Sequence, residues 1–176
     1  MTSQTEKLIK KLKIQMNGRP DEFQTPEYAV DILVPYLKRA NIKIIWECAI
    51  GKGFLADALN KKGFFIIKIY GDFLKIIPHD DFDCIVTNPP YSKKDEFLEK
   101  AYQIGKPFAF LLPLTALEGK RRQKLYKKYG VQLIIPNKRI NFITPSGKGS
   151  GAWFQTAWFC WKLNLPKQLN FVEATW

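Results

Sequence analysis

Histidine and cysteine are nearly missing from this sequence, which has one histidine and three cysteines in 176 residues. No two cysteines lie in Cys-X-X-Cys spacing, so these residues do not predict a metal site. An odd number of cysteines, each in or at the end of a strand-like apolar run, favours buried, reduced thiols. The sequence also has no signal peptide and no apolar run of about 18 residues, so we expect a cytoplasmic protein without a membrane partner.

Acidic residues are scarce relative to basic ones, with 16 Asp and Glu against 28 Lys and Arg, which gives a formal net charge of +12. Such an excess attracts polyanions and makes their binding salt-dependent, as expected for a nucleic-acid partner. One basic group lies in an N-terminal segment that we expect over residues 1–20. A second follows a predicted strand and contains Lys120, Arg121, Arg122, Lys124, Lys127 and Lys128. A solvated helix face explains this second group as well as phosphate contacts do.

Length and hydrophobic periodicity predict one α/β domain over residues 21–176, because 46% hydrophobic residues suffice for a full core. Helices are expected at 26–39, 53–62 and 92–105, and a basic helix is expected from 115, with Thr25, Ser92 and Thr115 as their N-caps. Strands are expected at 43–48, 64–70, 83–88, 107–112, 131–135 and 154–162. This alternation predicts a doubly wound, mostly parallel sheet with its ligand crevice at the carboxyl ends of the strands.

The third of these strands ends at Asn88-Pro89-Pro90-Tyr91. The prolines stop the strand and leave two fixed acceptors, the amide oxygen of Asn88 and the carbonyl of Pro89, beside the ring of Tyr91. Two such acceptors suit a planar amine, whose nitrogen must become more tetrahedral to attack a methyl donor. The ring of Tyr91 would hold a base by stacking. Residue types alone nevertheless favour an ordinary strand end with Tyr91 in the core.

Two further elements precede this one in the chain. The apolar run that ends at Glu47 is followed by Ala49, Gly51 and Gly53, and these glycines allow a tight turn and close approach of a ligand. The carboxylate of Glu47 is suited to accept from a ligand ammonium group. Alone, this pattern is as typical of an ordinary strand-to-helix turn. Upstream of it, Thr25-Pro26 is typical of a capped helix start.

Together these elements resemble the motifs of class I S-adenosylmethionine-dependent methyltransferases that act on amines. Residues 88–91 resemble their Asn/Asp-Pro-Pro-Tyr/Phe/Trp motif, and residues 47–53 resemble Asp/Glu-Pro-x-x-Gly-x-Gly, with Cys48 in place of proline and Lys52 between the glycines. Thr25-Pro26 resembles an element of N6-adenine DNA methyltransferases that touches the methionine end of the cofactor. The resemblance implies a Rossmann-like sheet of about six to seven strands whose last strand, near 154–162, is antiparallel.

The resemblance also implies roles for individual residues. The catalytic residues would be Asn88, Pro89, Pro90 and Tyr91. S-adenosylmethionine would be bound by Thr25, Pro26, Glu47, Ala49, Gly51, Gly53, Asp72, Phe73 and Asn88. Here Asp72-Phe73-Leu74 resembles an Asp-Phe-Leu element that holds the cofactor adenine, while the acid expected directly after the second strand is missing. Tyr91, Phe142 and Lys148 would bind the substrate, although a core role for Phe142 is equally compatible and Trp153 and Phe154 are rivals for it.

The implied activity is methyl transfer to the N6 amine of adenine in DNA. The chain has no recognizable target-recognition domain, so it would be permissive in sequence or would depend on a specificity subunit or a homodimer. Three alternatives remain open: an RNA adenine or guanine methyltransferase, a protein-glutamine methyltransferase, and a non-catalytic nucleic-acid-binding module with the same fold. Thr25-Pro26 favours DNA, and the net charge of +12 favours a polyanion over a protein substrate.

Overall fold

The computed structural model describes residues 23–69, 71–78, 80–143 and 154–176. The expected basic segment at 1–20 and Lys148 lie outside these residues. Seven strands form a single sheet in the order β2-β1-β3-β4-β6-β5-β7. Their bounds are β1 Ile44–Glu47, β2 Phe65–Lys68, β3 Cys84–Thr87, β4 Phe108–Pro113, β5 Gln132–Pro136, β6 Thr156–Trp161 and β7 Leu169–Val172.

The strands of this sheet run parallel except for β6, which is antiparallel to both of its neighbours, β4 and β5. The expected mostly parallel, Rossmann-like sheet and the antiparallel direction of the aromatic strand are confirmed. The short strand β7, which follows β6 in the chain and pairs with β5, was not predicted.

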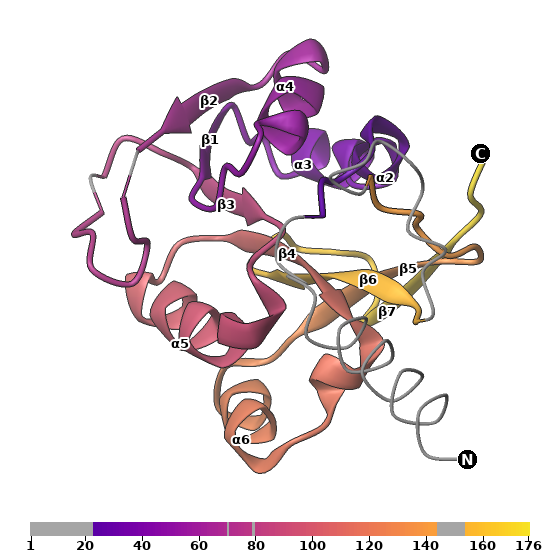
Figure 1. The fold of residues 1–176 in the computed structure, drawn as a ribbon. Coiled ribbons are helices and arrows are strands. Elements are labelled where there is room, and N and C mark those ends of the chain that lie inside the picture. The colour runs from indigo at the N-terminus through magenta and orange to yellow at the C-terminus, as the bar shows by residue number, and fades with distance from the viewer. Residues whose placement is uncertain (1–22, 70, 79, 144–153) are drawn as a thin grey trace, which may run out of the picture.

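Helices cover both faces of the sheet (Figure 1). One face carries α2 Glu27–Asp31, α3 Val34–Arg39 and α4 Phe54–Lys61, and the other carries α5 Lys94–Ile104 and α6 Lys120–Tyr129. Two 3-10 turns, η1 Tyr91–Lys93 and η2 Leu114–Leu117, precede α5 and α6. Each layer is held by its own buried cluster, in which Leu33 and Leu59 pack on one side and Phe97 and Leu98 on the other.

The expected helix 26–39 is wrong as one element, because the chain forms α2 and α3 with a break at residues 32–33. Pro35 occupies the first turn of α3, where its missing N–H costs nothing, and there it prevents a continuous helix. The expected N-caps are also displaced. Pro26 takes the N-cap position of α2, and α5 and α6 begin after Lys93 and Gly119, without a side-chain cap bond. The residues expected as caps, Thr25, Ser92 and Thr115, lie one to four residues earlier.

One carboxylate ties the first two central strands together. Asp83, directly before β3, accepts hydrogen bonds from the backbone N–H groups of Lys43 and Ile44, both at 2.8 Å to its Oδ2. These bonds, led by the one from Ile44, lower the pKa of Asp83. They align the starts of β1 and β3, so that the two strands also end together, and the carboxyl ends of β1 and β3 form the edge considered next.

Candidate active site

Glu47 and Thr87 are the last residues of two adjacent parallel strands, β1 and β3, and their side chains meet. The hydroxyl of Thr87 donates to Oε1 of Glu47 at 2.5 Å, and the backbone N–H of Ala49 donates to the same oxygen at 2.9 Å. Glu47 is only 1% exposed, and this burial raises its pKa to about 7, although both hydrogen bonds act in the opposite direction. No described residue gives this carboxylate a compensating positive charge at neutral pH, and a cationic ligand would provide one.

The glycine turn after β1 has the conformation that its sequence predicted. Gly51 has a φ of +54°, and Gly53, at the N-cap of α4, has a φ of +87°. A Cβ on Gly51 would lie 3.1 Å from Nε2 and 3.2 Å from Oε1 of Gln24, so the side chain of Gln24 needs the space that a glycine leaves. Oε1 of Gln24 also accepts the backbone N–H of Lys52 at 3.0 Å. The glycine turn is thus fixed to the segment that carries Thr25-Pro26.

That segment is held in place on its other side by the chain after β5. Gln24 and Ile143 exchange two backbone hydrogen bonds of 2.9 Å in an isolated antiparallel bridge. The hydroxyl of Tyr28 donates to the carbonyl of Asn141 at 3.0 Å. Three stretches that are distant in sequence, residues 24–26, 51–53 and 141–143, therefore lie together. The first two stretches carry residues that the sequence predicts to bind a cofactor, and the structure brings these two stretches together.

The Asn88–Tyr91 segment leaves the sheet directly after β3. Pro89 is buried, Pro90 precedes the 3-10 turn η1, and the carbonyl of Tyr91 accepts from Nζ of Lys94 at 3.1 Å. Among the described residues, neither Oδ1 of Asn88 nor the hydroxyl of Tyr91 has a hydrogen-bond partner, although both atoms are buried. Burial raises the pKa of Tyr91, so its hydroxyl stays protonated. An acceptor and a donor are thus held without partners at the end of one strand.

The aromatic residue beside Tyr91 is Phe154, whose ring centroid lies 6.0 Å from that of Tyr91 at an interplanar angle of 66°. Phe154 is 41% exposed, whereas Phe142 is 3% exposed and packs in the core cluster with Ala29 and Val30. Of the two roles that the sequence left open for Phe142, the structure thus places it in the core. The partly exposed Phe154 is better placed than Phe142 to contact a ligand beside Tyr91.

Asp72 and Phe73 differ in their surroundings. Asp72 is exposed, and its Oδ1 accepts the backbone N–H of Leu74 at 3.1 Å. Phe73 is 1% exposed, its ring packs 4.7 Å from that of Phe97, and Nζ of Lys100 lies 5.3 Å above it. A carboxylate of Asp72 is therefore accessible to a ligand, while the ring of Phe73 is occupied by core contacts.

Lys68 is the last residue of β2, directly before the place where an acid was expected. The register pairs Lys68 with Glu47, and Nζ of Lys68 lies 3.6 Å from Oδ1 of Asp57 in α4. Within the described residues, β2 is also the edge of the sheet, because the chain from 71 to 78 adds no strand beyond it. The charged side chains that meet at this point are thus Lys68 and Asp57, a pair that the sequence analysis did not identify.

Thr156 is a further residue that the sequence analysis missed. It begins the antiparallel strand β6 and pairs with Pro113, so it lies at the carboxyl edge of β4, in line with Glu47 and Thr87. It is fully buried, and no described residue accepts from or donates to its hydroxyl. Only the sheet order places Thr156 here, because a strand inserted backwards between β4 and β5 is not evident from local sequence.

Unpartnered buried oxygens are concentrated in these segments. In the part of the chain that the structure describes, six buried side-chain atoms have no hydrogen-bond partner; two are indole nitrogens, and four are oxygens, of Thr25, Asn88, Tyr91 and Thr156. Buried polar groups are paired in most native proteins, so each exception requires an explanation. All four oxygens belong to segments at the carboxyl edge of the sheet or packed against its glycine turn. A polar ligand bound at this edge would supply the missing partners.

Two observations bear on ions and membranes. No group of three or more His, Cys, Asp or Glu residues suited to a metal ion is found among the residues described. None of the described helices is long and apolar enough to cross a membrane. All three cysteines are buried free thiols, and burial raises the pKa of Cys48, the thiol beside Glu47.

Comparisons with known proteins place the fold. Neither a protein-family model nor a curated protein matches the chain in sequence. Among solved structures, a candidate class I S-adenosylmethionine-dependent methyltransferase from Listeria monocytogenes is similar with a TM-score of 0.51 and 13% identity, over 89% of this chain and 67% of that one. A candidate methyltransferase from Thermoplasma acidophilum has a TM-score of 0.33 and 12% identity, over 85% and 69% of the two chains. The likeness to the Listeria protein shows a shared Rossmann-like fold, and the function has to be argued from the site.

Proposed function

We propose that this chain is an S-adenosylmethionine-dependent methyltransferase that transfers a methyl group to the N6 amine of adenine in DNA. The observation that carries the proposal is the pair of buried, unpartnered oxygens of Asn88 and Tyr91 directly behind a strand end. In the Asn-Pro-Pro-Tyr motif that these residues resemble, an amine is held at this place. A strand end without a ligand would leave both oxygens desolvated at a cost of about 1–3 kcal/mol each.

The residues at the sheet edge fit the proposed cofactor. S-adenosylmethionine, when bound, supplies a methyl group carried by a cationic sulfur. Glu47 would accept from the ammonium of its methionine part, since its buried carboxylate has no positive partner in the described part of the chain. Gly51 and Gly53 would allow the backbone to approach it, and the unpaired hydroxyl of Thr25 would meet its polar end. The exposed carboxylate of Asp72 would accept from its adenine amine.

The side chains around the amine then have distinct tasks. Oδ1 of Asn88 would accept one N–H of the adenine amine, and the carbonyl of Pro89 would accept the other. Both acceptors favour the more tetrahedral, developing cationic nitrogen over the planar ground state. No strong base is required, because the methylated nitrogen is acidic enough to release its proton to water through the same acceptors. Tyr91 and Phe154 would hold the base between them.

The choice of DNA rests on two features. Thr25-Pro26 resembles an element of adenine DNA methyltransferases, and its packing against the glycine turn through Gln24 is consistent with a cofactor contact. The net charge of +12 favours a polyanionic substrate. An RNA substrate would use the same site, and a protein-glutamine substrate would not benefit from the charge.

A second candidate is favoured by Lys52 and by the missing acid after β2. No acid directly follows this strand, whose last residue is a cation, Lys68, paired with Asp57, and this would weaken the hold on the cofactor ribose. On this basis a non-catalytic nucleic-acid-binding module is the alternative to an enzyme. The two candidates differ in cofactor affinity and in methyl transfer.

The test is methyl transfer from labelled S-adenosylmethionine to adenine-containing duplex DNA, RNA and protein in parallel, with mass spectrometric detection of N6-methyladenine. We expect label in DNA, and we expect Asn88→Ala to lower kcat at least 100-fold, as is typical when one oxyanion-hole-type contact is lost. The matched control is Asn60→Ala, which removes an exposed side chain of α4 and should leave kcat unchanged. Label in RNA or protein alone would contradict the DNA assignment, and no label in any of them would favour the non-catalytic module.

A further inference from the structure

Helix α6 carries six basic residues, and its two arginines differ from its lysines in their surroundings. Nε and Nη2 of Arg121 donate to the carboxylate of Glu99 at 2.5 and 2.6 Å, and Nη1 lies 3.5 Å from Glu96. Nη1 of Arg122 donates to Asp95 at 2.5 Å. All three acids belong to α5, so the arginines fasten α6 to its neighbouring helix.

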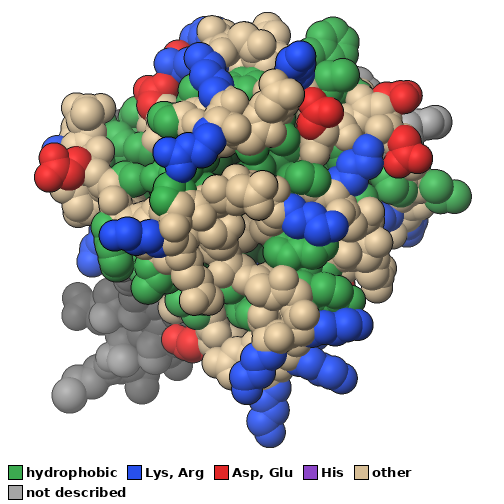
Figure 2. All heavy atoms as spheres, turned by 180° about the vertical axis from the view of Figure 1, so that it is seen from behind, with side chains coloured by type: hydrophobic (Ala, Val, Ile, Leu, Met, Phe, Trp, Pro, Cys, Tyr) green, Lys and Arg blue, Asp and Glu red, His purple; other side chains and the backbone are tan. Residues whose placement is uncertain are grey.

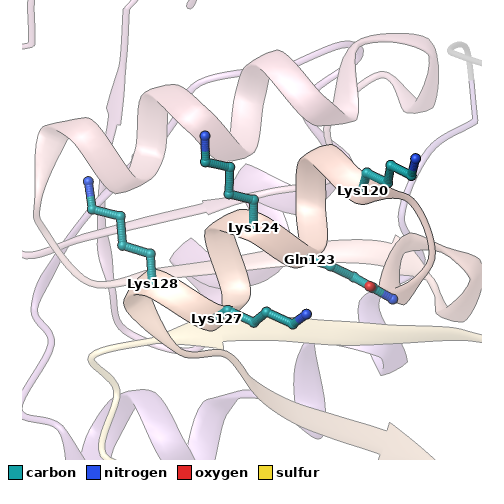
Figure 3. A pocket seen from close by; sticks show the side chains of 5 residues that line it. All are labelled: Lys120, Gln123, Lys124, Lys127 and Lys128. Carbon is teal, nitrogen blue, oxygen red and sulfur yellow. The ribbon is translucent and has the colours of Figure 1, made fainter.

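The lysines of α6 have no such neutralisation. No ion pair involving Lys120, Lys124, Lys127 or Lys128 is found in the described part of the chain, and the α5 acids nearest to α6 are engaged by the arginines. Together with Gln123, these four lysines line a shallow groove of about 500 Å³ (Figure 3). In the view from behind, Lys and Arg side chains gather at the lower end of the molecule, the end at which Figure 1 shows α6 (Figure 2). We call these four residues the lysine stripe.

The stripe destabilises the isolated protein in two ways, although the helix dipole favours Lys127 and Lys128 in the last turn of α6. Lys120 and Lys124, and Lys124 and Lys128, are four residues apart on one helix, so their like charges repel. The first turn of α6 contains no acid, and Lys120 stands there against the positive end of the helix dipole. Sequences that break local rules without compensation within the fold do so mainly at functional surfaces. An anionic partner would remove both sources of repulsion.

We propose that the lysine stripe binds the phosphate backbone of duplex DNA and supplies sequence-independent affinity for it. The proposal rests on the proposed function for the identity of the partner. Helix α6 starts after η2, which follows the carboxyl end of β4, so its Lys120 end is the end closer to the edge that holds Asn88. A duplex that lies along the stripe from this end would reach the candidate active site. Phosphate contacts of this kind position a duplex while the base itself is read elsewhere.

The size of the effect follows from counterion release. The slope of log Kobs against log salt changes by about 0.9 for each phosphate contact, so loss of three lysine contacts lowers it by about 2.7. Between 50 and 200 mM salt, the affinity of the wild-type protein should then fall about 40-fold more than that of a variant without the contacts.

The test compares two triple variants by fluorescence anisotropy with a labelled 20-base-pair DNA duplex, without cofactor, over this salt range. The first is Lys124→Gln/Lys127→Gln/Lys128→Gln, in which glutamine keeps a long side chain with good helix propensity. The control is Lys38→Gln/Lys43→Gln/Lys167→Gln, which removes the same charge from exposed positions outside α6. Lys38 lies in the last turn of α3, as Lys127 and Lys128 do in α6, so the control removes one last-turn charge where the α6 variant removes two. Urea unfolding of both variants establishes that they are folded.

We expect the salt slope of the α6 variant to be smaller in magnitude than that of the wild type by about 2.7. The slope of the control should stay close to that of the wild type. Equal slopes in the two variants would overturn the proposal, and so would tighter binding of an RNA duplex of the same sequence by the wild-type protein. The outcome is separable from that of the proposed function. An α6-dependent slope in a protein that methylates no DNA would support the surface and refute the enzyme. Methylation of DNA by the wild-type protein, together with equal salt slopes for the two variants, would support the enzyme and refute the surface.

Discussion

Replacing Glu47 by glutamine should stabilise the protein, and by an amount that depends on pH. Burial raises the pKa of Glu47 from its ordinary value of 4.5 to about 7. At about 1.4 kcal/mol per pH unit, this difference corresponds to about 3 kcal/mol of stability that is fully present below pH 4.5 and is lost as the pH rises through 7. Glutamine has no charge to desolvate, and its amide oxygen can still accept from Thr87 and Ala49.

Urea denaturation of wild type and Glu47→Gln at pH 5 and pH 8 measures the pH-dependent contribution of Glu47 to the free energy of unfolding. All other titrating groups are common to both proteins, so the stability difference between them should grow by about 2–3 kcal/mol from pH 5 to pH 8 in favour of the variant. The corresponding rise in the relative Tm is roughly 5–10 °C for a chain of this size. A difference in unfolding free energy that stays constant with pH would show that Glu47 titrates normally and is not a desolvated carboxylate that a cationic ligand would stabilise.

Further substitutions test other residues at this edge of the sheet. Gly51→Ala should cost about 1–2 kcal/mol in urea unfolding, because Gly51 has a left-handed backbone and a new Cβ would lie 3.1 Å from Nε2 of Gln24. Unchanged stability would mean that neither the backbone conformation nor the contact with Gln24 constrains the turn. Thr156→Val removes a hydroxyl that has no partner among the described residues, so it should raise the stability of the ligand-free protein by about 1 kcal/mol and also raise the KM for methyl transfer. Thr87→Val breaks a hydrogen bond to Glu47 and should therefore destabilise the ligand-free protein. A destabilised Thr156→Val would indicate that the hydroxyl is satisfied within the fold.

The parts of the site that could be predicted from the sequence depend on local chemistry. Two consecutive prolines end a strand wherever they occur, and glycines after a strand allow the left-handed turn that Gly51 and Gly53 adopt. Because β1 and β3 are adjacent and parallel, the residues at their carboxyl ends necessarily meet. The fold class followed from the same alternation of strands and helices.

The parts that could not be predicted depend on contacts between distant residues. Phe73 and Phe142 are buried, and Phe154 is exposed, because of how the sheet faces are covered, which the spacing of aromatic residues does not specify. The burial of Thr156 follows from the insertion of β6 between β4 and β5. The break between α2 and α3 is different, because Pro35 in the middle of an expected helix was a local signal that should have ended it.

The most direct test of the central claim is a calorimetric titration of the protein with S-adenosylmethionine at pH 8, where Glu47 is mostly ionised. The wild-type protein should bind at one saturable site. Glu47→Gln, which should be the more stable protein, should bind at least tenfold more weakly, because it has lost the charge that meets the ammonium group. Absence of saturable binding to the folded wild-type protein, or undiminished binding to Glu47→Gln, would contradict the account.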